Sequence, residues 1–175
     1  MADEGYVKPS NSIVVAGEPV TQFLKVETAT NMYPGRFVKK GTNGDDVVVA
    51  TAGAAAVGVL GYEHTIKKHR PATVDTIYLA DAQAAVLNGP GVVVVGSLAD
   101  SQTVVKGDRL VVAAAGEVKK ATAAAIPAGS TAVLSSGAQP TIEGSIPEEG
   151  IPVAIAEEGK TTSGASADIV MRLLQ

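Results

Sequence analysis

The 175-residue chain has a formal net charge of −4, no cysteine and only 3% aromatic residues. The negative charge argues against a nucleic-acid partner, which requires a basic field, and the lack of cysteine excludes disulfides and thiolate chemistry. No apolar run approaches the roughly 20 residues of a membrane span, and the acidic first residues do not resemble a secretory leader, so we expect synthesis in the cytoplasm.

The chain opens with a polar segment, residues 1–11, in which Lys8 precedes Pro9. A residue before proline is biased away from the helical region, so we expect an extended N-terminal arm. Tyr6 and Val7 are its only apolar anchors.

The rest of the chain alternates short Val-rich runs with glycine and proline, a pattern typical of β-strands and turns. Strands are predicted over residues 12–16, 21–27, 36–39, 47–50, 57–62, 76–80, 91–95, 109–113, 117–120, 151–157 and 167–174. This predicts an all-β protein, a small antiparallel barrel or sandwich with at most one or two short helices. We assign residues 1–30 to the arm and first strands and residues 31–175 to the barrel or sandwich, with 121–150 as a loop insertion.

The stretch of residues 33–63 forms the predicted frame of the fold. Asn43 and Gly44 tolerate the positive φ of a tight turn, so they predict a hairpin. Gly58 and Gly61 lie where a side chain would crowd a neighbouring strand. We expect substitutions at these turn and close-packing positions to disrupt folding.

Two segments that follow depart from this pattern. Residues 64–70, HTIKKHR, form the one concentrated basic patch, which is typical of a solvated loop; the alternative is a docking patch formed by Lys67, Lys68 and Arg70 for an acidic partner surface. Residues 81–87 are the best helix candidate, because Asp81 is a favourable N-cap residue.

A weak internal repeat relates residues 33–63 to residues 105–158. PGRFVKK corresponds to KGDRLVV, and AVGVLGYE corresponds to PVAIAEE. The second unit carries about 24 extra residues, which the Ala/Pro/Gly-rich segment 121–150 accounts for. A duplicated strand-turn-strand unit and chance similarity in a small alphabet both explain this pattern; a true duplication would make the two copies build the barrel together.

Motifs for nucleotide or metal binding fail on spacing. Gly159-Lys160-Thr161 ends like a phosphate-binding loop, but the glycine required five residues earlier is Ala154. His64 and His69 are five residues apart, a spacing that places them on one face of neither a helix nor a strand. We expect no cofactor and no metal.

Signatures of catalysis are also missing. No GxSxG or SxxK motif surrounds a serine. The adjacent acids 45–46, 148–149 and 157–158 point to opposite faces of an extended chain and cannot share a substrate. Residues 106–108, KGD, match a cell-attachment tripeptide but are more typical of a turn opening a strand. We therefore expect a protein that is not an enzyme.

The order of PGRFVKKG, VVVAT, AVGVLGYE, KGDRLVV, GEVKKAT, PVAIAEE and a terminal ADIVMRLL resembles the capsid cement (decoration) proteins of tailed phages and related archaeal viruses. The resemblance spans roughly residues 33–174. It implies a small all-β body that clusters, commonly as homotrimers, on the outer capsid surface of a virion and clamps neighbouring major capsid protein subunits. The N-terminal 30 residues and segment 121–150 are longer than in a minimal member.

The residues themselves suggest how such a protein would attach. An extended arm with Tyr6 and Val7, followed by Ile13, Val14 and Val15, would add a strand to an exposed edge of a capsid subunit. Repeated weak contacts around a symmetry axis would then act together.

Two other classes of function remain open from sequence alone. One is a tail or fibre accessory protein, which shares the Ala/Gly/Val composition. The other is a small β-barrel enzyme or ligand-binding domain whose residues converge only in space.

Overall fold

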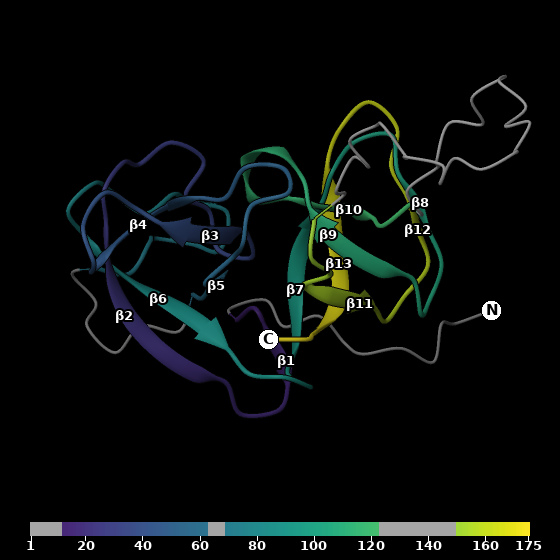
Figure 1. Ribbon diagram of the computed structural model, residues 1–175, viewed down its shortest axis with the longest axis horizontal. Helices are drawn as coiled ribbons and strands as arrows, with labels where there is room; N and C mark the ends of the chain where they lie inside the picture. The colour runs from purple at the N-terminus through teal and green to yellow at the C-terminus, as the bar shows by residue number, and fades with distance from the viewer. Residues whose placement is uncertain (1–11, 63–68, 123–149) are drawn as a thin grey trace, which may run out of the picture.

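The protein consists of two small β-barrels packed side by side (Figure 1). This computed structural model describes residues 12–62, 69–122 and 150–175. In chain order the elements are β1 Val14–Ala16, β2 Val20–Val26, β3 Phe37–Lys40, β4 Asp46–Val49, β5 Gly58–Leu60, β6 Gln83–Asn88, β7 Val93–Leu98, β8 Thr103–Val104, β9 Arg109–Val112, the 3-10 turn Ala114–Gly116, β10 Val118–Lys120, β11 Ala154–Ala156, β12 Lys160–Thr161 and β13 Ala167–Leu173. The all-β prediction is confirmed.

The first barrel closes in the order β2-β4-β3-β5-β6. Its side chains alternate, as a half-buried strand requires: Val38, Leu60 and Val86 point into the barrel, where they pack with Met32 and Tyr78. The Tyr78 hydroxyl donates to the Gly61 carbonyl at 2.6 Å, so the one large polar side chain in this core is satisfied.

The second barrel is formed by β7-β10-β9-β11-β13, which closes because β13 also pairs with β7. β1 adds to the edge of β7, with Val14 opposite Val94. β8 and β12 form a separate two-stranded ribbon. Val, Ala, Leu and Met side chains make up most of this interior.

The two barrels have the same connectivity and the same register. β2 pairs in parallel with β4 at Val26 and Val47, and β7 pairs in parallel with β10 at Leu98 and Val118. Strand for strand, β2, β3, β4, β5 and β6 correspond to β7, β9, β10, β11 and β13, and the cross-strand partners match around the whole ring without a slip. The internal repeat is therefore confirmed and is longer than the sequence suggested.

One expectation about the repeat is wrong. The two copies do not combine into a single barrel, because each copy closes its own. The sequence comparison missed β2 and β7 as the first strands of the two copies, and these strands close each ring through a parallel pairing that no local pattern indicates.

Two predicted elements are also wrong. Residues 81–87 do not form a helix; most of this segment is strand β6, paired along both edges with β2 and β5. Tertiary packing overrides the helix propensity of its alanines, since Ala84 to Leu87 are buried on alternating faces, and Asp81 adopts a left-handed φ of 62° instead of capping a helix. Residues 76–80 contain no strand.

The predicted hairpin at Asn43 and Gly44 exists, but its turn chemistry differs. β3 and β4 pair in antiparallel fashion across a loop of residues 41–45, and neither Asn43 nor Gly44 has a positive φ. The Asn43 amide donates to the Asp46 carboxylate at 2.5 Å, so a side-chain hydrogen bond holds the longer loop.

The barrels meet through a row of three side chains on the outer face of the first barrel. Phe37, Val59 and Leu87 are direct cross-strand neighbours on β3, β5 and β6, and all three belong to the core cluster that fills the second barrel. We call them the docking row.

Glycines let the two backbones approach at this contact. Gly116, in the 3-10 turn, has a φ of 70°, and a Cβ there would collide with the Phe37 carbonyl oxygen; its N–H donates to the Ala50 carbonyl at 2.8 Å. Arg36 then clamps the turn, donating to the Ala115 carbonyl and to the Glu117 carboxylate, each at 3.0 Å.

Substitution of two glycines by alanine separates close packing from turn chemistry. In Gly58→Ala the new Cβ would lie 2.5 Å from Asn88 Oδ1 and 2.7 Å from the Leu87 carbonyl oxygen, so we expect a loss of about 2 kcal/mol in the free energy of unfolding. Gly44→Ala meets open space and should change it by less than about 0.5 kcal/mol. Urea titration measures both; equal losses would contradict this packing and support the original expectation for Gly44.

The Arg36–Glu117 pair should couple the two barrels energetically. Both side chains are largely buried, at 15% and 17% exposure, so a double-mutant cycle with Arg36→Met and Glu117→Gln should give a coupling of about 1–2 kcal/mol. The exposed Lys25–Asp81 pair, at 2.7 Å, is the matched control and should show no measurable coupling. Similar values for both pairs in urea unfolding would refute a clamp.

Candidate functional site

The described part of the chain begins at residue 12, just before β1, which pairs with β7 of the second barrel. Tyr6 and Val7 lie outside the described residues. Ile13 is 3% exposed and belongs to the core, and Val14 and Val15 are half-buried residues of β1, which pairs with β7 of the same chain. β1 therefore fastens the start of the chain to the body, and capsid contact by these five residues stays a prediction.

The basic segment is described only at its end. Lys67 and Lys68 lie outside the described residues, whereas Arg70 is exposed and lies over the Tyr62 ring at 5.1 Å. His69 accepts a hydrogen bond from the Gln83 N–H at 3.2 Å through Nδ1. A hollow of about 240 Å³ next to it is lined by His69, Arg70 and mainly apolar residues up to Ala82.

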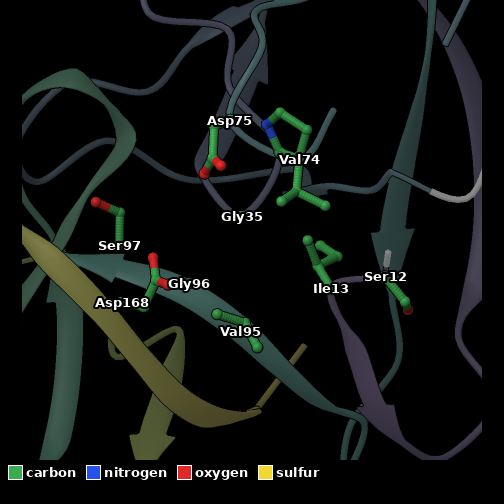
Figure 2. A pocket seen from close by; sticks show the side chains of 10 residues that line it. Ser12, Ile13, Gly35, Val74, Asp75, Val95, Gly96, Ser97 and Asp168 are labelled. Carbon is green, nitrogen blue, oxygen red and sulfur yellow. The ribbon is translucent and has the colours of Figure 1, made fainter. Parts of the chain in front are cut away.

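A second hollow, of about 90 Å³, lies at the seam between the barrels. Figure 2 shows Asp75 reaching it from one side and Asp168 and Ser97 from the other, with Gly35 between them. A Cβ on Gly35 would come within 2.9 Å of the Val95 carbonyl oxygen. This hollow therefore exists because the two backbones meet at a glycine. Among the described residues, no third acidic or histidine side chain joins its two carboxylates to form a metal site.

The motifs rejected on spacing have structural roles. Lys160 and Thr161 form β12, which pairs with β8 instead of preceding a helix. Gly107, with φ 94°, opens β9 as the turn interpretation predicts. Asp108 accepts hydrogen bonds from Lys120 and from the Val105 N–H, each at 2.8 Å. The bond from Lys120 has the larger effect, and together they hold the pKa of the Asp108 carboxyl below its usual range.

In the described ranges, no helix has the length and apolarity that crossing a membrane requires.

The structure also reveals a set of residues that sequence reasoning missed. Arg109, Ile155 and Arg172 are direct neighbours across β9, β11 and β13 on the outer face of the second barrel. Arg109 and Arg172 are exposed, and Arg172 Nε donates to Glu157 Oε1 at 2.8 Å. We call these three the basic row. The sequence does contain an indication of this arrangement. Side chains along a strand alternate between its two faces, so Arg109 in RLVV and Arg172 in DIVMRL can both point outward while their neighbours point inward.

Several large apolar side chains lie exposed on the surface of the two barrels. They include Val20, Phe23, Leu79, Val105 and Ile151.

Comparison with known proteins identifies the family. A search of curated proteins found no match. The model of a family described as structural cement protein (E217 gp24/Pam3 gp6) matches residues 5–170. The match includes both barrels and the segment between β10 and β11, so it covers nearly the whole chain. The chain therefore belongs to the structural cement proteins of phages.

Proposed function

We propose that this protein binds the outer surface of a phage capsid as a homotrimer and stabilises the shell by clamping neighbouring major capsid protein subunits, without catalysing a reaction. The family match over residues 5–170 carries this proposal. A cement protein needs a rigid body, a self-association face and an attachment segment, and each has a candidate in this chain.

The body supports the proposal by its construction. Two closed barrels leave few unpaired strand edges, and a close-packed contact with an ion pair joins them. Such a body transmits force between the surfaces it connects instead of deforming. The family match also favours a capsid role over an enzyme or ligand-binding domain.

The attachment segment is the arm of residues 1–11. Two residues after it β1 begins, and the buried Ile13 side chain and the pairing of β1 with β7 fix this strand to the second barrel. A strand added by Tyr6 and Val7 to a capsid subunit would thus be tied to the body by an ordered strand. Several copies around a symmetry axis would raise the avidity of weak single contacts.

Removal of the arm tests this mechanism. We expect deletion of residues 1–11 to leave the body folded, because β1 is retained, while capsid occupancy falls and the rupture temperature drops toward that of the undecorated shell. A second variant, Tyr6→Ser with Val7→Ser, keeps the arm's length but removes its two apolar anchors. It should lower capsid occupancy and rupture temperature as the deletion does. Wild-type occupancy and rupture temperature in both variants would remove the arm from the mechanism.

The basic segment provides a second test on the same particles. We expect Lys67→Glu with Lys68→Glu to lower capsid occupancy several-fold and to change its salt dependence, if these lysines meet an acidic capsid surface. Lys39→Glu with Lys40→Glu changes the same number of charges on β3 and is the control. Binding curves that coincide for the two pairs would leave residues 64–70 as a solvated loop.

A further inference from the structure

The duplication places two equivalent faces on one chain, of which only one is used internally. Val47 and Val118 occupy the same register position, and Lys40 and Val112 lie opposite them. On β3, Phe37 lies three residues before Lys40. On β9, Arg109 lies three residues before Val112. Their neighbours across the next two strands are Val59 and Leu87 in one barrel and Ile155 and Arg172 in the other. The basic row is therefore the counterpart of the docking row.

The docking row packs against a defined surface of the second barrel. The main chain of Phe37 lies against Gly116 of the 3-10 turn, two residues before Val118, because a Cβ on Gly116 would collide with the Phe37 carbonyl oxygen. Next to it Gly35 approaches the Val95 carbonyl on β7. This receiving surface thus consists of the turn before β10 and the outer side of β7.

The first barrel carries the equivalent receiving surface, and it is exposed. Two residues before Val47 is Asp45, in the loop before β4, which is exposed. Leu87 lies opposite Thr21 and Arg172 lies opposite Val93, so the position of Val95 corresponds to Phe23 on β2. Phe23 is one of two phenylalanines in the chain and is 46% exposed. This exposure is high for phenylalanine, which is usually buried.

The substitutions at the two equivalent faces are complementary. The internal contact brings the main chain at Phe37 against Gly116, and the corresponding positions on the exposed faces are occupied by Arg109 and Asp45. Neither of these two side chains forms an ion pair within residues 12–62, 69–122 and 150–175. A cation and a carboxylate at matching positions favour one another and define a register for the contact.

We propose that the basic row of one copy binds the Asp45 loop and the Phe23 face of a second copy, repeating between chains the contact that joins the two barrels within a chain. The contact is head-to-tail, so it closes into a ring when the rotation per copy permits. It presupposes the self-association proposed for this cement protein and names the residues that mediate it. Arg109 and Asp45 form the central ion pair, and Ile155 and Phe23 bury the apolar part.

Cysteine cross-linking tests the contact directly, since the chain has no cysteine of its own. Copies with Asp45→Cys are mixed with copies with Arg109→Cys and oxidised, in solution and on capsids. We expect a disulfide-linked heterodimer at several times the yield of a control mixture of Asp100→Cys and Arg109→Cys, in which Asp100 is an exposed acid of the second barrel. Control-level yields both in solution and on capsids would overturn the contact.

Charge exchange provides a second, reciprocal test. We expect Arg109→Asp and Asp45→Arg each to weaken self-association roughly tenfold in sedimentation, and the double variant to regain most of it. Single variants that associate like the wild type would overturn the ion pair. Normal capsid occupancy without the cross-link would refute this contact and leave the cement role intact. A cross-link without capsid occupancy would support this contact and contradict the cement role.

Discussion

The contact between the two barrels is the constraint on which the rest of the structure depends. Each barrel by itself is a ring of five short strands, with room inside for few large side chains. The first barrel therefore divides its apolar residues between two layers, with Val38, Leu60 and Val86 inside and Phe37, Val59 and Leu87 outside. The outer layer becomes a core only when the second barrel covers it. A fully buried phenylalanine contributes about 2–3 kcal/mol, so neither barrel is expected to keep its stability without the other.

This division explains the unusual composition. Small rings favour aliphatic side chains at inward positions and glycine where backbones cross, and they leave few places for aromatic residues. Of the two phenylalanines, one is buried between the barrels and the other is partly exposed on β2. Glycine at 35 and 116 permits the backbones to touch at this contact, where a Cβ would meet a carbonyl oxygen.

Sequence reasoning recovered those parts of the fold that local patterns encode. Alternation and β-branched runs predicted most strands, and the match of KGDRLVV to PGRFVKK indicated the repeat. Strand β6 was missed because its alanines favour a helix locally, while pairing to β2 and β5 decides its conformation. Barrel closure was missed because the parallel pairs joining β2 to β4 and β7 to β10 connect residues about 20 apart in sequence.

The contact surfaces were harder to predict, for a physical reason. The expected site residues were chosen because they are apolar near a terminus or concentrated in charge, both of which are properties of a segment. The basic row consists of single residues on three strands, and only the register brings Arg109, Ile155 and Arg172 together. The basic row gains meaning when it is compared with the docking row. The two rows occupy equivalent positions in the duplicated fold, so the contact made by one shows what kind of surface the other can bind. In the first barrel this face consists of apolar residues and is buried between the barrels; in the second it carries two exposed arginines, and charged positions of this kind can set the register of a contact.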